Sequence, residues 1–389
     1  MSGNPQTLKF IKTVGTGAFG AVYLAEMNSG QGFLRRVAVK FILANNPESQ
    51  KFLDRLRDEA LLLGLIQDNE IIQVLSLVKI DNLDAILMEY VEGIDLAKAF
   101  KVTPRLSPRA IAELGTACAG ALSRIHEAKH PKTNMLLDVI HRDIKPANIM
   151  LTKSGHIKIC DFGVARARGE WKKAYTNPKD VLGTLEYMDP HYLISGKISP
   201  AADVYALGLC LLEALTRKQY GHPKFRQDEH EEHLNEMLKD IPTELKSIRV
   251  LLKKILHWSP TTRPNAAQCA RLLSQISYEM PGESLRIWAS ANIPRLLKNK
   301  KPVKDAIGLL NRTVPIAYGE STPQQAMAED TDTDIPMVTV SEPVPVKTQP
   351  KPRRNTSGEK DRSFRMGVFF GIFIGLCGYI LTLIILLQE

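Results

Sequence analysis

Alternating hydrophobic and polar positions near the start of the chain predict a group of β-strands. Residues 8–13 and 22–26 follow this pattern, and Val37-Ala38-Val39-Lys40 continues it. Side chains of a strand point alternately to its two faces, so a period of two indicates strands with one face in a core. The chain therefore begins with a β-rich part.

A helical pattern follows between residues 46 and 63. Asn46 is a suitable N-cap, and Pro47 suits the first turn. Apolar residues then recur at the spacing of one helix face: Phe52, Leu56, Ala60 and Leu63. Glu59 borders this stripe, and by itself this position indicates a solvated helix glutamate.

The region beyond residue 278 looks helical and is mixed in polarity. We interpret residues 279–311 as a helical extension that packs on the preceding domain, with a partner-binding helix as the alternative. From residue 312 to 363 the chain is rich in Pro, Thr, Ser, Glu and Asp and poor in aromatic residues. Such a composition buries too little apolar surface to fold, so it predicts a disordered linker.

Residues 366–387 are uncharged and mostly apolar. About 22 such residues at 1.5 Å each span roughly 33 Å, enough to cross a bilayer as one helix. Basic residues precede this segment and only Gln388 and Glu389 follow it, which predicts a cytoplasmic position for the rest of the chain. We expect a single-pass membrane protein with a C-terminal anchor, in a bacterial inner membrane. Gly367, Gly371 and Gly375 have the spacing that lets two such helices pair, so a homodimer is one alternative to a simple anchor.

Charge and cysteine content narrow the class of protein. The formal net charge is +9, but the basic residues cluster late in the chain, so no nucleic-acid partner is expected. The five cysteines have neither metal-ligand spacing nor a disulfide framework, which fits a reducing compartment.

A glycine-rich run, Val14-Gly15-Thr16-Gly17-Ala18-Phe19-Gly20-Ala21-Val22, lies between the first two predicted strands. Glycines let backbone N–H groups approach phosphate oxygens without a Cβ in the way. No helix follows this run, which disfavours a dinucleotide-binding loop.

The most informative run is His141-Arg142-Asp143-Ile144-Lys145-Pro146-Ala147-Asn148, with Asp161-Phe162-Gly163 after it. It supplies a carboxylate that can accept a proton and two oxygen ligands for a hard cation. Phosphoryl transfer depends mainly on positioning and on neutralising charge, which such residues provide.

These motifs, in this order, resemble those of the eukaryotic-type (Hanks-type) serine/threonine protein kinases, of the bacterial membrane-anchored kind. The resemblance covers residues 8–278 and implies an α+β, bilobal protein kinase fold. We expect a tail at residues 1–7, a small β-rich N-lobe at 8–90 and a large helical C-lobe at 91–278. The single transmembrane helix would come in addition to this fold.

The resemblance also implies roles for single residues. Asp143 would accept the proton of the substrate hydroxyl, Lys145 would stabilise the γ-phosphate, and Asn148 and Asp161 would hold Mg²⁺ or Mn²⁺. ATP would be bound by the glycine loop, by the strand lysine Lys40 with the helix glutamate Glu59, by the pocket floor and by the hinge. Met88 would be the gatekeeper of this pocket. The residues in contact with ATP would be Val14, Gly15, Thr16, Gly17, Ala18, Phe19, Gly20, Val22, Ala38, Lys40, Glu59, Glu89, Val91 and Met150. Asp203 matches the aspartate that tethers the catalytic loop, and His141 is expected to pack in the core.

Three regulatory positions follow from the same resemblance. Arg142 would await an anion on the activation segment, which runs from Asp161 to Pro190, and Thr176 is the preferred phosphorylation site there. Thr184 would instead form a structural hydrogen bond near Asp143.

Two features depart from the family pattern. His191 stands where the family has a glutamate that pairs with the counterpart of Arg263, so Arg263 needs another carboxylate, with Asp189 as a candidate. Residues 130–138 form an insertion that we expect to be a surface loop.

The sequence thus predicts a membrane-tethered signalling kinase that phosphorylates protein serine and threonine and itself. A small-molecule phosphotransferase and a pseudokinase scaffold are the alternatives. The complete activation segment disfavours the first, and only His191 favours the second.

Overall fold

The computed structural model describes residues 6–17, 20–29, 32–42, 64–66, 68–162, 185–299 and 302–318. All of them belong to one compact unit, Met1–Asp332. The predicted helix at 46–63, the linker beyond residue 318 and the apolar segment at 366–387 lie outside these residues. Among the described helices, none is long and apolar enough to cross a membrane.

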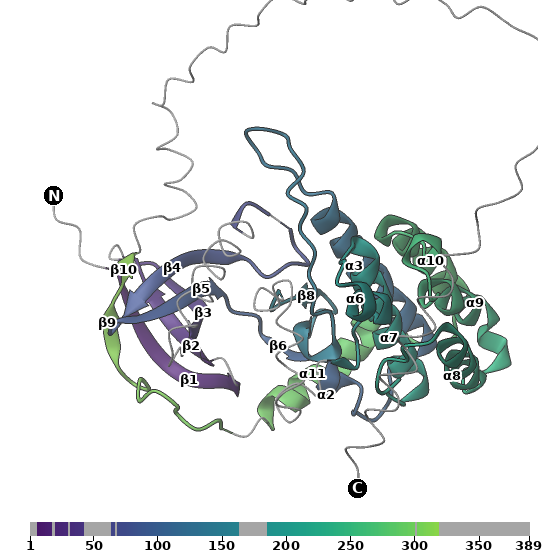
Figure 1. Cartoon of the computed structure of the whole chain (residues 1–389). Helices are drawn as coiled ribbons and strands as arrows, with labels where there is room; N and C mark the ends of the chain where they lie inside the picture. Colours follow the sequence, from purple (N-terminus) through teal and green to yellow (C-terminus); the bar gives the residue numbers. More distant parts are fainter. Residues whose placement is uncertain are drawn as a thin grey trace, which may run out of the picture. The chain divides into compact units, whose positions relative to one another are not determined.

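The N-terminal lobe is an antiparallel β-sheet, as the alternating pattern predicts (Figure 1). Its strands are β1 (Thr7–Gly17), β2 (Gly20–Asn28), β3 (Leu34–Ile42), β4 (Val74–Ile80) and β5 (Leu83–Glu89). The sheet encloses three aromatic side chains, Phe10, Tyr23 and Phe41, whose ring centroids lie 5.5–5.9 Å apart. All three are fully buried, so the aromatic cluster forms the centre of this lobe.

The C-terminal lobe is helical around one hydrophobic core. A small sheet of β6 (Gly93–Asp95), β7 (Ile149–Thr152) and β8 (Ile157–Ile159) lies on it. The helices and short 3-10 turns are α2 (Leu96–Ala99), α3 (Pro108–His126), η1 (Pro146–Asn148), α6 (Pro190–Ser195), α7 (Pro200–Thr216), α8 (Gln227–Lys239), η2 (Thr243–Leu245), α9 (Lys246–Ile255), η3 (Pro260–Thr262), α10 (Ala266–Glu279) and α11 (Leu285–Lys298).

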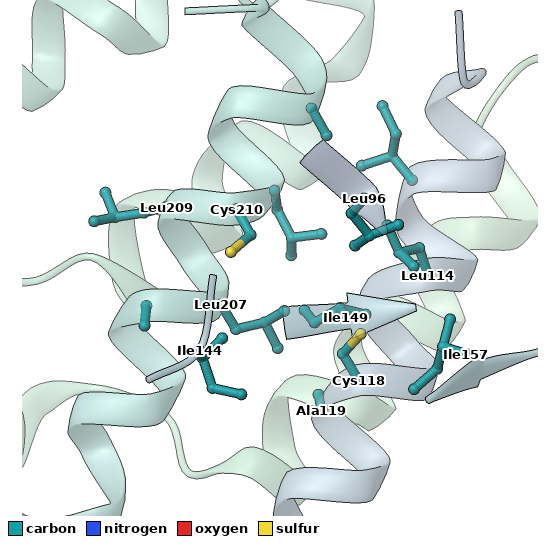
Figure 2. Packing of buried hydrophobic residues seen from close by; sticks show 14 of the residues in the cluster. Leu96, Leu114, Cys118, Ala119, Ile144, Ile149, Ile157, Leu207, Leu209 and Cys210 are labelled. Atoms are coloured by element: carbon teal, nitrogen blue, oxygen red, sulfur yellow. The ribbon is translucent and has the colours of Figure 1, made fainter. Parts of the chain in front are cut away.

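Local sequence signals account for several of these helices. Ser107 caps α3 by accepting a hydrogen bond from the N–H of Ala110, and Pro108 occupies the first turn. Asn265 and Gln268 form a reciprocal capping box at the start of α10. Helix α7 is buried on nearly every face and lies at the centre of the lobe, where Leu207 and Cys210 belong to the same cluster as Ile144 and Ile149 (Figure 2).

The expected helical extension is helical only from Leu285 to Lys298. Trp288 of α11 is fully buried and donates its indole N–H to the carbonyl of Pro104 at 2.9 Å. This contact fixes α11 on the C-terminal lobe.

Residues 302–318, which we call the strap, return to the N-terminal lobe. They contain β9 (Thr313–Pro315), which pairs with β1, and β10 (Ala317–Tyr318), which pairs with β4 (Figure 1). The boundary placed at residue 312 by composition is therefore wrong, because the following residues are strands. Their strand character comes from pairing with β1 and β4, which no local pattern of so few residues reveals.

The strap contributes to the core of the N-terminal lobe. Leu309 and Val314 are only 1% and 4% exposed and belong to the cluster that contains Phe10 and Tyr23. The lobe is thus completed by residues that follow it by more than 200 positions in the sequence.

We predict that Leu309→Ala lowers the free energy of unfolding by about 2–5 kcal/mol, because it leaves a cavity in this core. The matched control is Leu34→Ala, which truncates a leucine that is 66% exposed and should change stability by no more than about 0.5 kcal/mol. Urea denaturation followed by circular dichroism measures both. Equal losses would show that the strap does not support the core.

Candidate active site

The predicted catalytic loop, from His141 to Asn148, is hydrogen-bonded to one buried carboxylate of the helical core. Asp203, in the first turn of α7, accepts hydrogen bonds from the backbone N–H groups of His141 and Arg142, each at 2.8 Å. The ring of His126 lies 2.8 Å from the same carboxylate. Burial alone would raise the pKa of Asp203, but the hydrogen bond from His126 and the other partners lower it, so the carboxylate stays charged.

His141 has a structural position, as its sequence context predicts. Its side chain is fully buried and contacts the ring of Phe162, with centroids 4.3 Å apart. Burial lowers its pKa, and the neutral ring donates from Nε2 to the carbonyl of Cys160 while Nδ1 accepts from the N–H of Asp143. It therefore links the catalytic loop to the segment that carries Asp161.

Asp143 lies at the centre of a polar group. The ammonium of Lys145 lies 2.9 Å from its Oδ2, and the Nδ2 of Asn148 donates to the same atom at 2.8 Å. Nδ2 of Asn148 also donates to the backbone carbonyl of Asp143 at 2.9 Å. These contacts fix the carboxylate where a substrate hydroxyl can approach it.

The N-terminal lobe contributes Lys40 of β3, whose Nζ lies 2.5 Å from Oδ1 of Asp161. Burial raises the pKa of the Asp161 carboxyl, but Lys40, His141 and Lys145 together lower it below its ordinary value, so the group is ionised. Asp161 has a φ of 55°, a left-handed conformation that is uncommon for a residue with a Cβ. Such local strain is typical of functional sites held by their surroundings.

The donor set fits a divalent cation. The amide nitrogen of Asn148 is committed to Asp143, which leaves its Oδ1 available, and Asp161 offers an ionised carboxylate. Hard cations such as Mg²⁺ prefer oxygen ligands of this kind.

The segment between the lobes is braced by a pair that sequence reasoning missed. The carboxylate of Glu89 accepts from Nζ of Lys158 at 2.5 Å and from the N–H of Gln73 at 2.8 Å. The side chain of Glu89 thus faces β8, while no described residue pairs with the N–H of Val91. This leaves a backbone donor for an adenine edge.

The remaining predicted nucleotide contacts lie on neighbouring elements. Val22 is opposite Gly15 and Lys40 in the register of β1, β2 and β3, while Ala38 is opposite Met88. Met150 lies on β7 opposite Asp95. Val14 and Thr16 lie in β1, and Gly17 pairs with Gly20 where the hairpin turns.

Some predicted site residues lie outside the described part of the chain. These are Ala18, Phe19, Glu59, Thr176 and Thr184. Arg142 is described: it has a φ of 67°, and its buried Nε has no hydrogen-bond partner among the described residues. Its predicted pairing with a phosphate on Thr176 stays a prediction.

Asp189 takes the place that His191 leaves open. Its carboxylate accepts two hydrogen bonds from the guanidinium of Arg263, at 2.6 and 3.0 Å, and both side chains are buried. The other N–H groups of Arg263 donate to the carbonyls of Ala201, His257 and Trp258. The arginine is therefore fully satisfied, and His191 contributes only a backbone N–H to Asp189.

The insertion is exposed, as the sequence analysis expects for a surface loop. Met135 and Leu136 of the insertion are 69% and 56% exposed. The described cysteines are free thiols, and burial raises the pKa of Cys118 and Cys160, which makes both thiols unreactive.

Sequence reasoning also missed His126, the partner of Asp203. A single histidine in the last turn of α3 carries no signal of its own, and its partner lies 77 residues away. The carboxylate of Asp203 and the loop it holds were recognisable only through their motifs.

Comparisons with known proteins agree with this geometry. The model of the protein kinase domain matches residues 8–272. Serine/threonine-protein kinase PrkC of Bacillus subtilis is 31% identical over 208 residues, which are 54% of this chain and 30% of PrkC. Tyrosine-protein kinase MasK of Myxococcus xanthus is 29% identical over 274 residues, which are 66% of this chain and 41% of MasK. The matched regions thus span less than half the length of these relatives.

A solved structure supports the fold alone. The kinase domain of Mycobacterium tuberculosis PknI superposes with a TM-score of 0.51 at 21% identity, covering 72% of this chain and 98% of that domain. The bilobal fold expected from the sequence is confirmed.

We predict that Asp189→Ala lowers the free energy of unfolding by about 3–5 kcal/mol, because it leaves the charge of Arg263 buried without its partner. His191→Glu should stay within about 0.5 kcal/mol of the wild type, since the histidine side chain is not needed for this pair. Chemical denaturation of both variants measures the difference. A large loss in His191→Glu with a small one in Asp189→Ala would contradict this assignment.

Proposed function

The chain belongs to the protein kinase family, and from that premise we propose that it transfers the γ-phosphoryl group of ATP to serine and threonine hydroxyls of proteins. The observation that carries this proposal is the position of Asp143, held by Lys145 and Asn148 beside the Lys40–Asp161 pair. A protein kinase domain implies ATP with a divalent metal.

The residues divide the chemistry between them. Asp143 orients the substrate hydroxyl and accepts its proton as the oxygen attacks the γ-phosphorus, while the bond from that phosphorus to the bridging oxygen breaks and ADP leaves. Lys145 lies close enough to Asp143 to place a positive charge near the transferred group. Lys40 binds phosphate oxygens when it exchanges its contact with Asp161 for the nucleotide. A cation held by Asn148 and Asp161 would neutralise charge on the phosphates.

Serine and threonine are favoured over tyrosine as acceptors. Lys145 follows Asp143 at the position where the serine/threonine branch has its lysine, and PrkC is named a serine/threonine-protein kinase. MasK is named a tyrosine-protein kinase, so phosphotyrosine is the competing outcome. The pseudokinase alternative loses its motivation, because Asp189 supplies the carboxylate that His191 lacks.

We predict that Asp143→Asn lowers the rate of phosphoryl transfer by orders of magnitude, because it removes the proton acceptor, while ATP binding changes little. Asp138→Asn is the matched control, since it makes the same change at an exposed position in the insertion and should leave the rate unaltered. Purified variants with labelled ATP and a generic protein substrate give the rate. Phosphoamino-acid analysis gives the acceptor.

Two results would contradict the proposal. Retention of most activity in Asp143→Asn would exclude its catalytic role. Phosphotyrosine as the main product of the wild type would exclude the serine/threonine assignment.

We also propose that residues 366–387 anchor the chain in a membrane with the catalytic domain on the cytoplasmic side, and that the glycine face of this segment pairs two chains. A tether of roughly 50 residues has a root-mean-square reach near 40 Å, so pairing would hold two domains close enough for phosphorylation in trans.

In reconstituted membranes at equal, low surface density, we expect the Gly371→Ile, Gly375→Ile double variant to autophosphorylate more slowly per molecule than the wild type. A Leu376→Ile, Leu383→Ile variant keeps all the glycines and serves as the control. Failure of the wild type to remain with membranes after alkaline extraction would exclude the anchor. Equal rates and equal cross-linking yields would exclude pairing.

A further inference from the structure

The strap ends the described part of the chain and lies beyond residue 272, where the match to the protein kinase domain stops. Its strands β9 and β10 are separated by Ile316 alone, yet they pair with the two outer strands, β1 and β4. The N–H of Phe10 donates to the carbonyl of Arg312, and the N–H of Asn311 donates to the carbonyl of Phe10. Strand β1 is therefore hydrogen-bonded on both sides, to β2 and to the strap.

The carboxylate of Asp305 joins the strap to Tyr23 of β2, and we call these hydrogen bonds the lock. Oδ1 of Asp305 accepts the hydroxyl of Tyr23 at 2.7 Å and the N–H of Gly308 at 2.9 Å. Its Oδ2 accepts the N–H of Leu310 at 3.0 Å. The backbone bond from Leu310, together with Tyr23, lowers the pKa of Asp305 to about 2, so the carboxylate is charged at neutral pH.

Tyr23 depends on the strap for its polar contacts. The side chain is fully buried between Phe10 and Phe41, and its hydroxyl is hydrogen-bonded to the strap, through Asp305 and the N–H of Ile307. Without these partners a hydroxyl would be left unpaired in an apolar core, which is costly.

The lock lies next to the hairpin of β1 and β2, which carries the glycine-rich run and which we call the glycine hairpin. Tyr23 directly follows Val22, which is opposite Gly15 and Lys40 in the sheet, and Tyr23 itself is opposite Thr13 and Val39. A shift of Tyr23 would therefore move β1 and β2, which carry the glycine-rich run, and the adjacent Lys40 of β3. The strap contacts both strands of that hairpin, through β9 on β1 and through Asp305 on β2.

We propose that the strap holds the glycine hairpin in the conformation that binds nucleotide, and that Asp305 is a positioning residue that acts through Tyr23. This proposal rests on the proposed function, since it concerns the nucleotide site of the same enzyme. The lock affects nucleotide binding, whereas the proton transfer at Asp143 lies on the other lobe. Loss of the lock therefore raises the KM for ATP more than it lowers kcat.

The test compares Asp305→Ala with the conservative Asp305→Asn in the full chain, at a temperature where circular dichroism shows both folded. Asp305→Ala should raise the KM for ATP and the Kd for ADP on the order of tenfold, the effect of one buried hydrogen bond. In Asp305→Asn, Oδ1 still accepts from Tyr23 and Gly308 and only the contact with the N–H of Leu310 is lost, so both constants should rise less than in Asp305→Ala. Asp81→Asn is the control, because it breaks the exposed pair of Asp81 with Arg312 on the same strap and should change neither.

Amide hydrogen exchange separates positioning from simple support of the fold. The proposal expects faster exchange in residues 7–17 of Asp305→Ala, with exchange in α7 unchanged. A lower Tm with unaltered KM, Kd and exchange in β1 would overturn it and leave the strap a structural element only.

Two further measurements keep the test decisive. If Asp305→Ala does not fold, Tyr23→Phe is the second variant. It breaks the contact with Asp305 by removing the hydroxyl, so no unpaired hydroxyl is left in the core. Tyr23→Phe should still raise the Kd for ADP, and an unchanged Kd overturns the proposal. If the wild type binds ADP but transfers no phosphoryl group, the proposed function fails while the Kd values still judge the strap.

Discussion

The active site depends on the carboxylate of Asp203. It lies in the first turn of α7, where the helix dipole favours a negative charge, and it is 1% exposed. Its two oxygens hold consecutive N–H groups of the catalytic loop, and this pairing stabilises Arg142 in a left-handed backbone conformation. Because α7 is buried on nearly every face, it is rigid, and its hydrogen bonds hold the catalytic loop in one position.

Contacts between the lobes extend this rigidity to the nucleotide site. Ile71 bridges to Ile159, and the side chain of Lys158 reaches both the carbonyl of Ile71 and the carboxylate of Glu89. Strand β8 therefore connects β5, which ends at Glu89, to the residues that lead to Asp161. Lys40 completes the connection from β3. The charged groups that act on phosphate are thus placed by elements from both lobes.

The strap solves a second physical problem, the exposure of sheet edges. An outer strand presents unpaired N–H and C=O groups to any other strand. Residues 313–318 pair with one end of β1 and one end of β4, so they cover part of both edges, and the strap also adds Leu309 and Val314 to the core. The N-terminal lobe reaches its complete form only when the chain has passed through the C-terminal lobe and returned.

The sequence by itself determined the motifs whose residues lie close together in the chain. The strand pattern, the catalytic loop from His141 to Asn148 and the aspartate at 161 each carry their meaning within a few residues, since backbone geometry couples near neighbours. The same locality explains why the sequence named Asp189 only as a candidate partner of Arg263, 74 residues away. The tertiary structure alone decided that pairing, the position of His126 and the return of the strap, where Asp305 meets Tyr23 across 282 residues. A hydrogen bond between two such side chains depends on the folded path of the whole intervening chain, and no periodicity at either residue records it.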